Sequence, residues 1–282
     1  MDLIPPALPI ADVTCGDLVI EGHSASAFSS FVMIRSLNLC FDAGSCIEEM
    51  LPLDHLFITH GHQDHILGVT RYAGLRRLQR MPEPTIYLPS TIAKEMGALF
   101  DSMARLEGKS GWTAPLCPMD NGQRVFLNPR LMAEAFDVTH TLPSLGYTIY
   151  DYKEKLKPEY DGTPGRLLGD LRRSGTQITN PVETPLVTYV GDCTAATLPI
   201  VANMPVSRVL IIESTFVDDA HYDLAEKRGH LHIDDLAKMG DALGHEHIVL
   251  THFSRRYQGS DIKRRVLRRL PESLSSRVQV LA

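Results

Sequence analysis

Short apolar runs alternate with polar stretches along most of the chain, as is typical of a protein with many strands. Near the N-terminus, three β-prone runs within residues 17–42 are separated by Gly, Ser and Asn, which predicts a meander of antiparallel strands. A second sheet is predicted from further runs rich in alternating, β-branched or aromatic positions. These runs are residues 124–127, 131–138 and 147–150.

Helical spacing of apolar residues follows two of the early strands. It predicts a basic amphipathic helix over residues 66–79 and a second helix that Ser90 caps and that continues through residue 106. Strands and helices alternate again after residue 185. The predicted strands are 186–190, 208–212, 247–250 and 278–281, and the predicted helices are 195–202, 233–243 and 260–270.

Residues 151–185 differ from the rest of the chain. They are rich in Lys, Glu, Gly, Pro and Arg and hold few apolar residues, so we expect an excursion from the core that covers or grips something. The 282 residues otherwise fit one large α/β domain at least as well as two small ones. We therefore predict a single domain over residues 1–282.

Composition narrows the class of protein. Hydrophobic content of 44% and charged content of 22% are ordinary for a soluble globular chain. The formal net charge of −6 argues against a protein that binds nucleic acid through overall positive charge, but it leaves room for a local basic surface. Three segments could supply one: Arg71, Arg76, Arg77 and Arg80; Lys153, Lys155, Lys157, Arg166, Arg172 and Arg173; and Lys263, Arg264, Arg265, Arg268 and Arg269.

The cysteines and the N-terminus suggest a compartment. Five cysteines without a C-x-x-C pair argue against a disulfide framework and for a reducing cytosol. The first six residues lack a basic segment and hold two prolines, so we expect no secretory signal. No apolar run approaches membrane-spanning length, which predicts a cytoplasmic protein with no membrane partner.

The densest chemistry lies in residues 59–69. Here His60, His62, Asp64 and His65 form a His-x-His-x-Asp-His cluster between an apolar run at 56–58 and the start of a helical pattern. The cluster therefore falls on a strand-to-helix loop, where side chains can converge at the end of a sheet. Imidazole and carboxylate are ligands of catalytic zinc, so the cluster predicts a zinc site.

Three more residues could complete that site: His140, Asp192 and His252. Each follows an apolar strand and can reach the same rim of a sheet. Any one of them alone would more often be a turn or capping residue. Joined to the cluster they give enough ligands for two metals with a position left for water, which is the signature of a catalytic site.

In this order the ligand motifs resemble those of the metallo-β-lactamase superfamily, and within it the compact short forms of the tRNase Z endoribonucleases. Three further strings carry the resemblance: Ser-Leu-Gly-Tyr at 144–147, Ile-Glu-Ser-Thr-Phe at 212–216 with Arg-Gly-His at 228–230, and Thr-His-Phe-Ser-Arg-Arg-Tyr at 251–257. The resemblance implies a four-layer αββα sandwich, a reduced substrate-gripping arm at 151–185 and a homodimer. It assigns two Zn²⁺ per subunit: His60, His62 and His140 bind one, Asp64, His65 and His252 bind the other, and Asp192 bridges them.

The function implied is removal of the 3′ trailer from precursor tRNA by metal-hydroxide attack on a phosphodiester. Asp64 would orient the attacking water or accept its proton, and His230 would act as general acid, with Glu213 orienting its ring. Otherwise Glu213 would merely cap a loop and His230 would be a surface residue. Candidate substrate-binding residues are Ser144, Tyr147, Thr215 and Arg256, although loop hydroxyls are usually local caps.

Two other functions remain open on the sequence. One is a related phosphodiesterase that acts on small or cyclic diesters, which the short arm makes conceivable. The other is a noncatalytic RNA-binding relative, because a protein can lose catalytic activity and still keep the fold. The intact set of ligands argues against the second.

Overall fold

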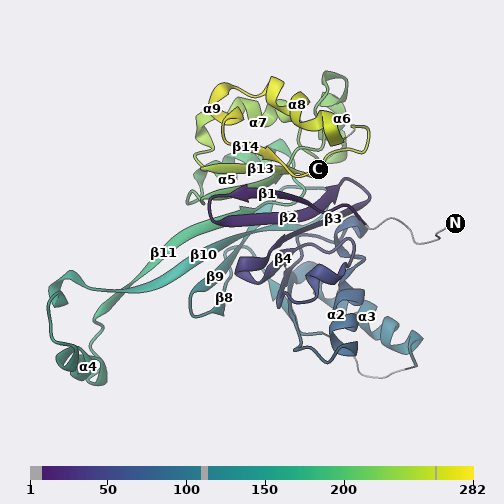
Figure 1. Ribbon diagram of the computed structural model, residues 1–282. Coiled ribbons are helices and arrows are strands. Elements are labelled where there is room, and N and C mark those ends of the chain that lie inside the picture. Colours follow the sequence, from purple (N-terminus) through teal and green to yellow (C-terminus); the bar gives the residue numbers. More distant parts are fainter. Residues whose placement is uncertain (1–7, 109–113, 258) are drawn as a thin grey trace.

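Two seven-stranded sheets form the body of the protein, and helices cover their outer faces (Figure 1). The structure is a computed structural model that describes residues 8–108, 114–257 and 259–282. The N-terminal segment 1–6, for which we expect no secretory signal, lies outside the described residues. Among the helices described, none is long and apolar enough to cross a membrane.

The first sheet runs in chain order, with antiparallel pairing from β1 to β4 and parallel pairing from β4 to β7. Its strands are β1 Ala11–Cys15, β2 Leu18–Ala25, β3 Ser29–Ile34, β4 Leu39–Phe41, β5 His55–Phe57, β6 Thr85–Pro89 and β7 Leu116–Met119. The associated helices are α1 Gln63–Ile66, α2 Val69–Leu78 and α3 Ser90–Leu106. The predicted antiparallel meander is confirmed.

The second sheet has the order β14-β13-β12-β11-β10-β9-β8. Its strands are β8 Arg124–Asn128, β9 Leu131–Val138, β10 Ser144–Leu156, β11 Thr179–Tyr189, β12 Val209–Glu213, β13 His247–Thr251 and β14 Val278–Val280. The helices near it are α5 Leu198–Asn203, α6 Tyr222–Arg228, α7 Ile233–Met239, α8 Gly259–Arg269 and α9 Glu272–Ser275. Strands β11 to β14 are parallel, so their carboxyl ends share one edge.

Three apolar clusters lie between four layers. The central one joins inward side chains of both sheets, such as Phe41 and Phe57 from the first and Tyr189 from the second. A second cluster lies between the second sheet and its helices, and a third between the first sheet and α2 and α3. Strands buried on both faces have no polar face, and β3, β12 and β4 are buried at every position. The predicted αββα sandwich is confirmed.

The excursion at 151–185 is a two-stranded ribbon with a helix at its tip. Strands β10 and β11 remain paired as far as Leu156 opposite Thr179, and α4, Gly165–Arg173, lies beyond them. Figure 1 shows this ribbon reaching away from the body. The sequence predicted strands only at 147–150 and 186–190, so both predicted strands are shorter than β10 and β11. Because the outer halves of both strands face solvent, they carry no apolar alternation that could have indicated them.

Several local predictions were wrong in their details. The predicted helix at 66–79 is confirmed as α2, Val69–Leu78, although Ile66 belongs to the separate short helix α1. Strands β1 and β7 were missed because both are short and β7 contains Pro118. Ser90 is the first residue of α3 and does not cap it. Its hydroxyl instead donates a hydrogen bond to Asp120.

Arg76 is buried and does not belong to a basic surface. Its side chain is 1% exposed, and its guanidinium donates to the Leu51 carbonyl at 2.7 Å and the Pro82 carbonyl at 2.8 Å and pairs with Asp54 at 2.5 Å. The prediction that it contributes to an RNA path is therefore wrong.

On α8, three of the five cations are also engaged in ion pairs: Arg264 with Asp261, Arg265 with Asp218, and Arg269 with Asp219 and Asp234.

Replacing Arg76 with alanine should lower the free energy of unfolding by about 3 kcal/mol, because it leaves buried carbonyls unpaired and opens a cavity. Urea unfolding followed by circular dichroism would measure the change. Arg71→Ala on the exposed face of the same helix is the matched control and should change stability by less than about 0.5 kcal/mol. Equal midpoints for the two variants would contradict the structural role of Arg76.

Candidate metal centre

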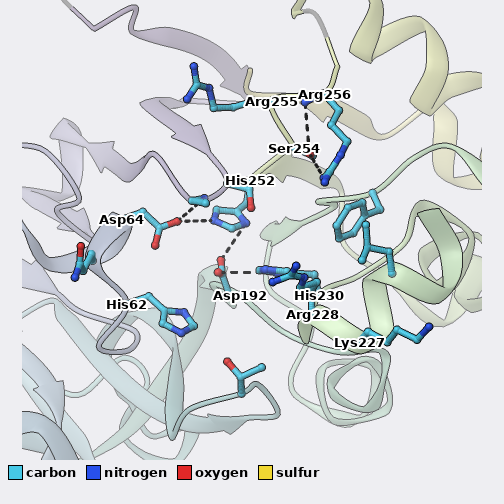
Figure 2. A pocket seen from close by; sticks show the side chains of 16 residues that line it. His62, Asp64, Asp192, Lys227, Arg228, His230, His252, Ser254, Arg255 and Arg256 are labelled. Atoms are coloured by element: carbon cyan, nitrogen blue, oxygen red, sulfur yellow. Dashed lines mark hydrogen bonds and ion pairs between the residues drawn. The ribbon is translucent and has the colours of Figure 1, made fainter. Parts of the chain in front are cut away.

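The predicted ligands meet at one edge of the sandwich, although they come from distant parts of the chain. His60, His62, Asp64 and His65 lie on the loop and short helix after β5. The other three follow β9, β11 and β13, whose carboxyl ends lie at the same edge because these strands run in the same direction. Figure 2 shows side chains from both groups converging on one pocket.

One group of donor atoms comprises His60, His62, His140 and Asp192, with one atom from each lying within 4.8 Å of the others. Nε2 of His60 is 2.9 Å from Nδ1 of His62, which is 3.3 Å from Nε2 of His140. Oδ2 of Asp192 is 3.8 Å from Nε2 of His60. Four donors at these distances can surround one cation.

A second group comprises Asp64, His65 and His252. Nε2 of His65 lies 3.4 Å from Nε2 of His252, and Oδ2 of Asp64 lies 3.8 and 3.5 Å from these two atoms. Asp192 reaches this group as well, with its carboxylate oxygens 3.4 Å from Nε2 of His65 and 3.3 Å from Nδ1 of His252. Asp192 is therefore the carboxylate that the two groups share.

The pKa shifts of most of these side chains suit divalent cations. His65 differs: burial lowers its pKa, but Asp192 and Asp42 outweigh burial and raise it well above the usual value. Burial lowers the pKa of His60 well below its usual value and also lowers the pKa of His62 and His140, so their nitrogens keep free lone pairs. Burial would raise the pKa of Asp192, but His252 and His65 hold it well below its usual range. Oδ1 of Asp192 is buried and accepts no hydrogen bond from the described residues, so a cation would satisfy it. The donor set therefore fits two divalent metal ions.

Asp42 supports the site and was missed by the sequence analysis. It directly follows β4, in a left-handed conformation with φ of 58°, and is fully buried. Its carboxylate accepts hydrogen bonds from Nδ1 of His65 at 2.9 Å, from the Tyr189 hydroxyl at 2.9 Å and from Thr59 N–H at 2.8 Å. The hydrogen bond from Nδ1 of His65 orients the ring so that its Nε2 points toward the cluster of donor atoms. The only signal was an Asp directly after a buried strand, which is also common in ordinary turns.

Gly191 places Asp192. Its φ of 71° is in the left-handed region, and a Cβ there would lie 2.8 Å from Cγ2 of Thr59. Only glycine allows both the turn and this close approach of the two sheets. His252 also has a positive φ, 60°, without being glycine, a backbone strain often found at functional sites.

The predicted pair of Glu213 and His230 is present at the end of β12. Nδ1 of His230 donates to Oε1 of Glu213 at 2.8 Å, and Glu213 is fully buried. Glu213 also accepts hydrogen bonds from the backbone N–H of Cys193, Thr215 and Leu231, so it holds the surrounding loops as well. Burial lowers the pKa of His230, but Glu213 and Asp192 outweigh it and raise that pKa to about 9. His230 is therefore not an unpaired surface residue.

The candidate substrate-binding residues do not gather at the site as expected. Tyr147 is fully buried and donates to the Ile58 carbonyl at 2.7 Å, so it is a core residue and cannot reach a phosphate. Ser144 is buried and donates to the Leu142 carbonyl, away from the metal cluster. The Thr215 hydroxyl donates to Glu213 and lies 3.1 Å from Nδ1 of His252, which makes it a positioning group. Of these four candidate residues, only Arg256 is exposed and lines the pocket.

A cleft of about 1020 Å³ opens over the donor groups. Asp64, Asp192, His230 and His252 lie at its base, and its rim carries four cations: Lys227, Arg228, Arg255 and Arg256. Figure 2 shows Arg255 and Arg256 on one side of the cluster and Lys227 on another. Within the described parts of the chain, none of the four forms an ion pair with a carboxylate. Lys227, Arg228 and Arg255 occur in the sequence in pairs and not in a run, so no sequence pattern indicated them as a basic surface.

Comparison with known proteins identifies the family. The model of the β-lactamase superfamily domain matches residues 43–253, and a tRNase Z of Arabidopsis thaliana is 35% identical over 265 residues, covering 93% of this chain and 94% of the relative. The chain belongs to the tRNase Z family of the metallo-β-lactamase superfamily.

Two further likenesses agree with this family membership. A nuclear ribonuclease Z of Triticum aestivum is 39% identical over 163 residues, which are 58% of this chain and 92% of that relative. The crystal structure of the short form of human tRNase Z has a TM-score of 0.58 at 19% identity, covering 88% of this chain and 93% of that one. At that identity the structural likeness supports the fold alone.

Proposed function

We propose that this chain is an endoribonuclease that removes the 3′ trailer of precursor tRNA, with two Zn²⁺ ions as its cofactor. The observation that carries the proposal is His230, held by Glu213 in the same cleft as both donor groups. Hydrolysis of a ribose O3′–phosphate bond expels a poor leaving group and needs such an acid. The tRNase Z relatives support the choice of substrate.

In the proposed holoenzyme, His60, His62 and His140 would hold one zinc ion, and Asp64, His65 and His252 would hold the other. Asp192 would serve as the ligand that both groups of donors share. When bound, the two cations supply a water-derived nucleophile near neutral pH and neutralise charge on the phosphate oxygens. The histidine nitrogens and carboxylates match the preference of zinc for N and O ligands.

The remaining steps belong to side chains of this protein. Burial would raise the pKa of Asp64, but His252 and His65 lower it to about 2, so an ionised carboxylate is available to take the proton of the attacking water. His230 gives its proton to the departing ribose O3′, and Glu213 keeps the ring oriented. The four rim cations hold the flanking phosphates. The products are a tRNA with a 3′-hydroxyl and a trailer with a 5′-phosphate.

The proposal is tested with a 5′-labelled precursor tRNA. We expect one cut at the trailer junction, loss of cleavage in chelator and recovery on addition of zinc, with end groups identified by mass spectrometry. A protein that hydrolyses bis(p-nitrophenyl) phosphate but leaves the precursor intact would instead be a small-diester phosphodiesterase. A zinc-loaded protein that cleaves neither substrate would be a noncatalytic relative.

We also propose that the ribbon of β10, β11 and α4 contacts the tRNA away from the cleft. Arg166 and Arg172 on α4 are exposed, and no ion pair to either is found in the described chain. Replacing both with alanine should raise KM for the precursor several-fold and reduce the salt slope of binding by about 2. Since a small diester cannot reach the ribbon, its turnover should not change. Equal losses on both substrates would contradict the proposed contact.

Assembly and compartment complete the proposal. We propose a homodimer, which light scattering of the purified protein would detect. Cytoplasmic location is supported by the five cysteines, all of which are free in the structure. Because the wheat relative is named nuclear, a fluorescent fusion imaged against a nuclear marker is the direct test of location.

A further inference from the structure

Phe28 is an exposed aromatic side chain at the rim of the cleft. It lies in the turn between β2 and β3, and 51% of it is accessible to solvent. The two residues before it, Ser26 and Ala27, line the cleft. A large apolar ring beside a charged pocket is a feature that neither the metal site nor the proposed acid requires.

The turn that carries Phe28 is fastened to the metal site. The backbone N–H of Ala27 donates to Oδ2 of Asp64 at 2.7 Å, and that of Ser26 donates to the Phe253 carbonyl at 3.2 Å. These bonds tie the turn to a proposed metal ligand and to the residue after another one. The backbone of the turn that carries Phe28 is therefore fixed relative to the proposed metal site.

Arg255 completes the feature. Its guanidinium carbon lies 4.7 Å from the centroid of the Phe28 ring, and the side chain is exposed and lines the cleft. The ring of His23 lies 6.1 Å from that of Phe28, centroid to centroid, at an interplanar angle of 70°, so the two rings pack edge to face. Two planar groups, one aromatic and one cationic, are thus exposed together on the Asp64 side of the cleft.

We propose that Phe28 and Arg255 form a platform that stacks an unpaired nucleobase next to the scissile phosphodiester. The inference rests on the proposed function, because it places a nucleotide in the cleft. A cleft of about 1020 Å³ has room for nucleotides on either side of the reacting phosphate. The cations Lys227 and Arg228 serve phosphates on the His230 side, whereas the Phe28 ring has only a π face to offer.

The proposed platform also predicts that the enzyme does not distinguish among the four bases at the stacked position. A phenyl ring has no hydrogen-bonding group, and every base has a π face, so stacking here tolerates all four bases. It requires only that a base be present. Removal of the base, and not its exchange, is therefore the decisive change in the substrate.

The test measures kcat/KM of the zinc-loaded enzyme on intact precursor tRNAs and on precursors with an abasic residue at each unpaired position beside the cut. Phe28→Ala should lower kcat/KM about tenfold on the intact substrate, mainly through KM. On the substrate lacking the stacked base, wild type should show the same loss and Phe28→Ala no further loss. Phe28→Trp should retain wild-type values.

Two more variants separate stacking from charge and from surface change. Arg255→Lys keeps the charge but loses the plane, so part of its effect should also vanish on the abasic substrate. Val206→Ala removes an apolar side chain that is equally exposed, at 52%, but precedes β12 at the opposite end of the strand from the cleft. It should leave kcat/KM unchanged.

The proposal is overturned if Phe28→Ala cleaves the intact precursor within twofold of wild type, or if its loss persists on every abasic substrate. Failure of the proposed function gives a different result. In that case the wild-type protein itself leaves all precursors uncut, and the proposed platform is rejected together with the proposed function.

Discussion

Replacing His230 with alanine should lower kcat for precursor tRNA by about 10² to 10⁴-fold, the usual contribution of a general acid. The ring lies in the cleft and is held by Glu213 at 2.8 Å, and its pKa is raised to about 9, so it carries a proton at neutral pH. Without it, ribose O3′ must depart as an alkoxide. Quenched-flow measurement of single-turnover cleavage would report the chemical step directly.

A change of leaving group separates acid catalysis from a structural effect. p-Nitrophenolate departs without protonation, so His230→Ala should retain most of its activity on a p-nitrophenyl diester. Glu213→Gln should show a smaller loss with the same dependence on leaving group, because it acts through the ring of His230. His221→Ala serves as a control, since His221 contacts Tyr257 at 2.9 Å and is not part of the cleft wall. Equal losses on both substrates would exclude His230 as the acid.

Replacing Asp192 with asparagine should cost more than about 10³-fold in activity, because even partners of metal ligands contribute about 10 to 100-fold. Asp192 lies 3.4 Å from His65 and 3.3 Å from His252 and also approaches His60. The substitution keeps the shape of the side chain but removes the negative charge that would attract the two proposed zinc ions. Metal analysis of purified protein should show a fall from two zinc ions per chain to one or none.

The control for this variant is Asp101→Asn, on the exposed surface of α3, which should bind two zinc ions and keep full activity. Thermal unfolding with and without added zinc gives a second readout. Wild type and Asp101→Asn should both be stabilised by zinc, whereas Asp192→Asn should not. An Asp192→Asn protein that retains two zinc ions would contradict the bridging role.

Two patterns in the sequence indicated side chains that the structure brings together, for different physical reasons. The cluster at 60–65 was found because its donors are neighbours in the chain on one strand-to-helix loop. His140, Asp192 and His252 were found because each follows a buried strand, and strands that run in the same direction end at one edge. Apolar patterning likewise predicted both sheets, since strands buried between layers consist mostly of apolar residues.

Burial was the main source of error. Arg76 and Arg77 are adjacent arginines in the sequence, but only Arg76 points into the gap between α2 and the segment around Leu53. Tyr147 follows a ligand motif and has a hydroxyl, but the part of β10 within the body is buried on both faces. Which side of a helix or strand faces the interior depends on what packs against it, and that is set by distant residues.

The sequence by itself determined the types of the candidate ligands, their order and the two-sheet architecture, because these follow from local spacing and from apolar periodicity. Only the tertiary structure revealed the hydrogen bond that His65 donates to Asp42, the cationic rim of the cleft and the pairing of Phe28 with Arg255. These contacts join residues that are far apart in the sequence and meet only in the folded chain. No local pattern encodes such a meeting, because each residue taken alone resembles an ordinary turn or surface residue.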